Sequence, residues 1–252
     1  MPNSARFDTS TGFAPEPVNA AIERMNKERL GTAKGLVWGG AVYEGLYMDS
    51  FPRILFLMKE AHCQSPQEVW GMPWHLKNQV EGRVDGPLKE PRFYKTWRFL
   101  GCMMAGITGK MPSYQSLMAN GPDAFDYICK QGLSKTAVLN IKKTPGTSES
   151  NSRELMAYLK EPAHSQLLMD ELSMLAPQLV ICSGNYDILR SCLPDVRERE
   201  WPCGARTFIT AGSNAVFLEF VHPSIRGVKR NVLYTYLQCA CYDIMTAYGW
   251  LH

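Results

Sequence analysis

The sequence lacks the features that mark several large classes of protein. Its eight cysteines include no CxxC pair and no Cys/His spacing of the zinc-binding type. No uninterrupted apolar run approaches the roughly 18 residues that cross a bilayer, and the N-terminal segment MPNSARFDTSTGFAPEP has no apolar signal core. We therefore expect a soluble, cytoplasmic protein with reduced thiols, no bound metal and no membrane contact.

Three common phosphate-binding and catalytic signatures are also missing. The 252 residues contain no GxxxxGK[ST], no GxSxG and no GxGxxG, which argues against P-loop enzymes, nucleophile-elbow hydrolases and dinucleotide-binding folds. The formal net charge of +3 is too small for a polycationic arm. It is compatible with a local basic patch that faces an anionic partner.

Four short apolar runs predict the fold class. They lie at 53–58, 136–140, 178–182 and 216–221, and they are typical of strands buried on both faces of a sheet. Segments with helical spacing separate and flank these runs, at 17–30, 92–107, 152–160, 165–176, 185–193 and 228–248. The alternation of strands and helices predicts an α/β protein in which residues 1–252 form one domain.

The segment at about 64–91 does not fit the alternating pattern. It is long, is interrupted by glycine and proline, and carries Trp70 and Trp74. Loops of this length in compact domains are usually functional, so we expect an active-site insertion. A peripheral loop whose tryptophans cover the core is the alternative.

Polar side chains collect where the four predicted strands end. Glu60 follows the first strand, Asn140 ends the second, Ser183 and Gly184 end the third, and His222 follows the fourth. Ligands of open parallel sheets bind beyond the carboxyl ends of the strands. The four strand ends therefore predict one site.

At these strand ends the sequence resembles the uracil-DNA glycosylase superfamily, from about residue 53 to about 245. KEAHC at 59–63 falls where the family has GQDPY or GEAPG, although Lys59 and His62 replace the glycine and proline. GMPW at 71–74 resembles a GxPF element, and AVLNIKKTPG at 137–146 resembles the segment with the base-reading asparagine. LAPQLVICSGNYDIL at 175–189 and HPS at 222–224 complete the resemblance.

The resemblance implies a three-layer α/β/α sandwich around a central, mainly parallel four-stranded sheet. It also implies a monofunctional glycosylase that flips a pyrimidine out of DNA and hydrolyses its N-glycosidic bond. The reaction places positive charge on the sugar and negative charge on the base. In this interpretation a neutral His222 donates a hydrogen bond to the pyrimidine O2, and Pro223 stiffens the loop that carries it.

The residue that activates water is left open by the first motif. Glu60 is its only acid, and a carboxylate can stabilise an oxocarbenium ion or orient water. Ala61, however, stands where the family has its water-activating Asp or Asn. Either Glu60 takes this role, or substrate phosphates stabilise the cation, or Glu68 or Asp85 enters from the insertion.

The remaining candidates are implied by position. Asn140 would bind the Watson–Crick edge of uracil or cytosine, Trp74 would stack on the base, and Ala61, His62 and Cys63 would line the pocket. Cys63 replaces a tyrosine that blocks pyrimidine C5 in GQDPY relatives, which leaves room for a substituent. The candidate DNA contacts are Lys142, Lys143, Ser183, Gly184, Pro223, Ser224, Ile225, Arg226, Lys229 and Arg230, with Ile225 as an apolar wedge and Ser183-Gly184 as a phosphate-binding helix start.

We expect a monomer that acts on single- or double-stranded DNA without a cofactor. No cysteine precedes Cys63, so the close N-terminal pair that an iron–sulfur cluster needs in some relatives is absent. The expected substrate is a modified pyrimidine, for example modified cytosine in phage DNA, with a role in antiviral defence. The alternatives are uracil repair, a non-catalytic DNA-binding relative, and an unrelated hydrolase of phosphorylated small molecules.

Overall fold

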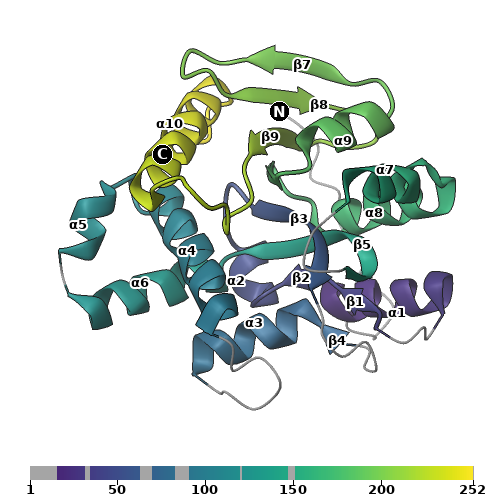
Figure 1. Cartoon of the computed structure of the whole chain (residues 1–252), viewed down its shortest axis with the longest axis horizontal. Coiled ribbons are helices and arrows are strands. Elements are labelled where there is room, and N and C mark those ends of the chain that lie inside the picture. The colour runs from purple at the N-terminus through teal and green to yellow at the C-terminus, as the bar shows by residue number, and fades with distance from the viewer. Residues whose placement is uncertain are drawn as a thin grey trace, which may run out of the picture.

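The computed structural model describes residues 16–31, 35–62, 70–82, 91–119, 121–146 and 151–251. Within these ranges the chain is an α/β protein with a seven-stranded mixed sheet and helices on both faces (Figure 1). Two short strands, β1 (Val37–Trp38) and β4 (Trp70–Gly71), form a separate parallel pair. The α/β class expected from the sequence is confirmed.

The four predicted apolar runs form the centre of the large sheet. Its strand order is β2-β5-β3-β6-β9-β8-β7, and β5, β3, β6 and β9 are mutually parallel. Three antiparallel strands extend this centre, β2 at one edge and β8 and β7 at the other, so the predicted four-stranded sheet is too small. The strands are β2 (Gly40–Ala41), β3 (Ile54–His62), β5 (Ala137–Gly146), β6 (Leu179–Ser183), β7 (Arg197–Glu200), β8 (Arg206–Ile209) and β9 (Val216–Phe220).

Alternate residues of the central strands pack on opposite faces of the sheet. In β3, Ile54 and Phe56 enter one apolar core, while Leu55 and Leu57 enter the other, and all four are fully buried. Both faces are therefore covered, which explains why these strands are continuous apolar runs without polar alternation.

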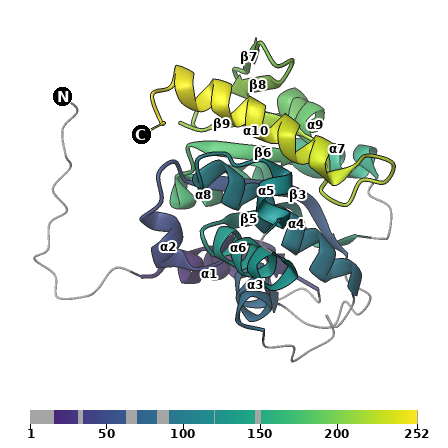
Figure 2. The ribbon, with the colours of Figure 1, turned by 90° about the vertical axis from the view of Figure 1, so that its left-hand side faces the viewer.

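Ten helices of the described part cover the two faces. Figure 2 shows the face that carries α3, α4, α6 and α10. On this side are α3 (Met72–Glu81), α4 (Pro91–Thr108), α5 (Tyr114–Met118), α6 (Pro122–Ser134) and α10 (Arg230–Ala247). On the other side are α1 (Val18–Leu30), α2 (Glu44–Met48), α7 (Ser152–Lys160), α8 (Pro162–Leu175) and α9 (Tyr186–Cys192). None of the described helices is long and apolar enough to cross a membrane.

The segment at about 64–91 contains regular structure, so the prediction of one long loop is wrong in its middle part. Residues 70–71 form β4 and residues 72–81 form α3, whose start has Pro73 in its first turn, a position that suits proline. Leu76 is buried in the core. The flanking residues 63–69 and 83–90, which include Glu68 and Asp85, lie outside the described residues.

A buried ion pair joins β5 to the helices behind it. Lys143 on β5 and Glu171 on α8 are both almost fully buried, with 2.5 Å between Nζ and Oε2. Lys143 Nζ also donates to the carbonyl oxygen of Asn140 at 2.6 Å, and Asn26 on α1 donates to Glu171 Oε1 at 2.8 Å. This network fixes the polar end of β5 against α1 and α8.

Removing one partner of this pair is expected to destabilise the fold strongly. Lys143→Met leaves the Glu171 carboxylate buried without its cation, which costs about 3–5 kcal/mol of unfolding free energy. Urea unfolding followed by circular dichroism measures this loss. The double variant Lys143→Met/Glu171→Leu removes both charges and is expected to recover most of it.

The exposed pair Lys27–Glu23 provides a matched control, because its N–O distance is also 2.5 Å. Lys27→Met is expected to change the unfolding free energy by about 0.5 kcal/mol or less, since exposed pairs contribute little. An equal, small effect of Lys143→Met and Lys27→Met would contradict the role given to the buried pair.

Candidate active site

The strand order places a topological switch point between β3 and β6. The chain passes from β3 to β5 on one side of it and then to β6 on the other side. In open α/β sheets ligands bind at such a point, outside the carboxyl ends of the strands. Those ends carry Lys59 and Glu60 on β3 and Ser183 and Gly184 on β6, and His222 follows the neighbouring β9.

His222 is held by the turn that follows β9. The backbone N–H of Ile225 donates to the carbonyl oxygen of His222 at 2.9 Å and closes the turn around Pro223. The backbone N–H of Ser224 donates to His222 Nδ1 at 3.2 Å, and the Ser224 hydroxyl lies 2.7 Å from the same nitrogen. Because Nδ1 accepts, the proton of the neutral ring is on Nε2. The ring therefore presents Nε2–H as a hydrogen-bond donor.

The environment of His222 keeps its ring neutral. Burial, together with the positive charge of Lys59, lowers the pKa of His222 from 6.5 to about 4. At neutral pH the imidazole therefore carries no charge. Its Nε2–H can donate to a developing oxyanion without a prior proton transfer.

Lys59 and Gly184 lie beside His222. A Cβ placed on Gly184 would be 3.3 Å from Lys59 Cε and 3.7 Å from His222 Cβ. Gly184 also has a φ of 75°, a conformation that side chains disfavour, so glycine suits this turn in two ways. Sequence reasoning did not select Lys59 as a site residue.

Glu60 and Asn140 lie on the other side of the switch point, towards β5. The Glu60 side chain is 7% exposed, and its Oε2 is 3.5 Å from Lys142 Nζ. Lys142 also lies 3.7 Å from Glu154 at the start of α7. Asn140 pairs in register with Met58 of β3 and is buried, and its Nδ2 has no hydrogen-bond partner. An unpaired buried amide is costly unless a ligand completes it.

Three predicted DNA contacts do not fit the structure. Lys143 is in the buried ion pair with Glu171, so it is not available to a phosphate. Ser183 is fully buried, and the Gly184 N–H already donates to the Phe220 carbonyl at 2.7 Å. The helix that follows, α9, has only seven residues. The predicted phosphate site at this helix start is therefore not supported.

The base-pocket candidates have different surroundings. Ala61 is buried in the core shared with α4 and α10. Trp74, on α3, is 59% exposed, so it is not a core tryptophan and its ring is available for stacking. Cys63 and the side chain of His62 lie outside the described residues.

A basic groove lies next to His222. It has a volume of about 540 Å³ and runs between the loop that follows β9 and the starts of α4 and α10. The lining includes Lys95, Arg226 and Arg230, together with the half-exposed apolar residues Ile225 and Val228. The full lining is Lys95, Thr96, Pro223, Ser224, Ile225, Arg226, Val228, Arg230 and Leu233.

The predicted contacts of this loop thus fall into two groups. Pro223, Ser224, Ile225, Arg226 and Arg230 line one groove, as expected for a shared binding surface. Lys229 is exposed and occupies the N-cap position of α10, without a capping hydrogen bond from its side chain. The Arg230 guanidinium lies 5.3 Å from the Phe99 ring centroid, which holds it against α4.

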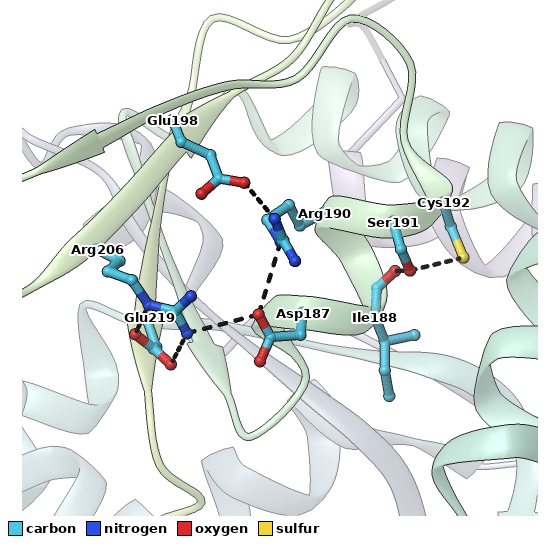
Figure 3. A network of polar contacts seen from close by, with 8 residues as sticks. All are labelled: Asp187, Ile188, Arg190, Ser191, Cys192, Glu198, Arg206 and Glu219. Atoms are coloured by element: carbon cyan, nitrogen blue, oxygen red, sulfur yellow. Dashed lines mark hydrogen bonds and ion pairs between the residues drawn. The ribbon is translucent and has the colours of Figure 1, made fainter.

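A charged network joins β9, the strand that precedes His222, to α9, β8 and β7 (Figure 3). Arg206 on β8 donates to both carboxylate oxygens of Glu219 on β9, at 2.7 and 2.6 Å. Asp187 on α9 lies between Arg206, at 3.5 Å, and Arg190, at 3.6 Å, and Arg190 reaches Glu198 on β7 at 2.6 Å. These contacts tie the end of β9 to α9 and to the antiparallel hairpin.

Comparison with models of protein families and with curated protein sequences gives no match for this chain. Within the described ranges no three His, Cys, Asp or Glu side chains gather closely enough to hold a metal ion. The functional assignment therefore depends on the geometry of the site and on the motifs at its strand ends.

The protonation state of His222 can be measured directly. In ¹⁵N-histidine NMR spectra we expect the His222 ring to be the Nε2–H tautomer at pH 7 and to titrate near pH 4, well below the usual 6.5. A His222→Gln variant assigns the signals, because burial also lowers the pKa of His75 to about 4. Titration near pH 6.5, or a proton on Nδ1, would contradict the geometry given above.

Proposed function

We propose that the protein is a DNA glycosylase that extrudes a pyrimidine and hydrolyses its N-glycosidic bond. The observation that carries this proposal is the neutral His222, which presents Nε2–H at a switch point and beside a basic groove. The α/β fold with its parallel centre is compatible with the uracil-DNA glycosylase-like sandwich expected from the motifs. The proposal includes a cytoplasmic location and a monomeric state.

In this mechanism the bond between C1′ and the base nitrogen breaks, and its electron pair moves onto the base. His222 Nε2–H donates to O2, where the negative charge develops, and such a donor contributes about 3–4 kcal/mol to catalysis. Asn140 supplies the unpaired Nδ2 for the edge of the base. Water then adds to C1′ of the oxocarbenium ion, and the proton that it loses ends on the departed base anion, so that the abasic sugar and the free base are both neutral.

Glu60 is the described acid best placed to serve the sugar side. It is shielded from solvent, and its partner Lys142 holds the carboxylate at the end of β3. A carboxylate in this position can stabilise the oxocarbenium ion or accept the proton of the attacking water. Ala61 does not compete for this role, because it has no polar group and is packed in the core.

The basic groove would receive the DNA backbone. Arg226 and Arg230 supply cations, and the exposed Ile225 supplies an apolar group that can fill the space left by an extruded base. These groups lie on the loop that also carries His222. Binding of the backbone and positioning of the imidazole would therefore be coupled.

The substrate that we propose is a modified pyrimidine, with excision of modified cytosine from phage DNA as the role in defence. This choice depends on the small Cys63 in the first motif, and uracil is the alternative substrate. A non-catalytic DNA-binding relative is the alternative without chemistry. The remaining alternative, a hydrolase of phosphorylated small molecules, needs a phosphate-binding turn at Ser183-Gly184. That turn is not available, because Ser183 is buried and the Gly184 N–H already donates a hydrogen bond to Phe220.

An abasic-site assay tests the reaction and names the base. The substrates are paired oligonucleotides and phage DNAs that contain uracil, hydroxymethyluracil, hydroxymethylcytosine or glucosylated hydroxymethylcytosine. We expect cleavage of one substrate, and His222→Ala should lower kcat by about 10²- to 10³-fold because the oxyanion loses its donor. Glu60→Gln should lower kcat as well if the carboxylate serves the sugar side.

Arg197→Ala is the matched control for this assay, because Arg197 lies on the exposed edge strand β7. It should leave the rate unchanged. If the protein binds DNA but forms no abasic product from any of the four substrates, the catalytic proposal is overturned and the alternative of a non-catalytic DNA-binding protein is supported.

The groove predicts the salt dependence of DNA binding. If Arg226 contacts one phosphate, Arg226→Ala should weaken binding of all sequences alike and reduce the slope of log K against log salt by about 0.9. Fluorescence anisotropy at several salt concentrations measures both quantities. An unchanged slope would exclude a phosphate contact at Arg226, and Arg197→Ala again serves as the control.

A further inference from the structure

Lys59 is a cation that the mechanism above does not use. Within the described residues its ammonium makes no hydrogen bond and no ion pair, whereas its neighbours Lys142 and Lys143 both have carboxylate partners. Its side chain is half-buried at the switch point between β3 and β6. A partly desolvated charge without a protein partner is unfavourable, and an anionic ligand would relieve this cost.

Lys59 and His222 both lie beside Gly184. The Cβ position of Gly184 lies 3.3 Å from Lys59 Cε, 3.5 Å from His222 N and 3.7 Å from His222 Cβ, so the two side chains flank the same bare backbone turn. The charge of Lys59 is also close enough to lower the pKa of the imidazole.

His222 provides a second free hydrogen-bond donor beside the Lys59 ammonium. Nδ1 is occupied by Ser224, and within the described residues Nε2 makes no hydrogen bond. The turn at Gly184 thus has an ammonium on one side and an N–H donor on the other. Together they can complement a negatively charged oxygen, which takes strong hydrogen bonds from charged and directional donors.

We propose that the Lys59 ammonium and the His222 Nε2–H together form an oxyanion-binding site at the switch point. The naming of the anion rests on the proposed function: it is either O2 of the departing pyrimidine or a phosphate oxygen of the DNA next to the extruded nucleotide. Both sources present the same chemistry, an oxygen that carries negative charge.

The site itself can be tested without any reaction. Inorganic phosphate and free uracil, the latter at a pH that ionises it, are titrated into the wild-type protein while the ¹⁵N signals of His222 are followed. We expect one or both anions to shift these signals. Lys59→Met should weaken the binding at least about tenfold and raise the pKa of His222, whereas Lys59→Arg should retain most of both properties.

Lys160→Met is the matched control, since Lys160 is exposed at the end of α7. It should bind the anions as the wild type does. Binding of neither anion by the wild type, or equal binding by the wild type and Lys59→Met, would overturn the proposal.

Kinetics on the cleavable DNA then distinguish the two sources. If the anion is the departing base, Lys59→Met lowers kcat and leaves the affinity for DNA unchanged. If it is a phosphate, Lys59→Met raises KM, reduces the salt dependence of binding and leaves kcat unchanged. If the protein binds the small anions through Lys59 but releases no base from any DNA, the anion-binding site is supported and the proposed glycosylase activity is overturned.

Discussion

The buried pair of Lys143 and Glu171 is the constraint on which the polar end of the sheet depends. Two charges removed from water are stable only when each is paired and its remaining hydrogen bonds are made. Here Asn26 completes the carboxylate, and the Asn140 carbonyl completes the ammonium. Because the network spans β5, α8 and α1, a shift of any one element would leave a buried charge without a partner. The backbone of Asn140 is therefore held in place from behind.

The alternation of side chains along a strand divides the site into two halves. Lys59 lies beside Gly184 and His222, whereas the next residue, Glu60, pairs in register with Lys142 of β5 and lies 3.5 Å from its ammonium. As successive residues of one strand, the two side chains point to opposite faces of the sheet. One half offers hydrogen-bond donors and positive charge, and the other offers a carboxylate. A reaction that separates charge, with an anion leaving and a cation remaining, needs both kinds of group. A single strand end provides them in adjacent positions.

The sequence predicted those parts of the fold and site whose environment leaves a pattern. The central strands are buried on both faces, so they appear as apolar runs, and His222 is marked by the proline that follows it. The edge strand β7 is exposed at all four residues of RERE, and it carries no apolar signal at all. Lys143 was assigned to the surface because a lysine gives no sign of burial until its partner, 28 residues away, is placed beside it. Lys59 was missed because its importance comes from Gly184 and His222, which only the fold brings near.

The neutrality of His222 is a consequence of the same arrangement and gives the two donors separate tasks. Burial and the nearby ammonium both disfavour the imidazolium, so the ring provides a directional N–H but no charge. The charge is supplied by Lys59, whose flexible chain and compact ammonium place few limits on direction. An imidazolium in the same position would lie beside another cation, and the repulsion would oppose the burial of both. Thus Lys59 adds to the effect of burial in keeping the histidine neutral, and in the proposed anion site it provides the charge that the neutral histidine lacks.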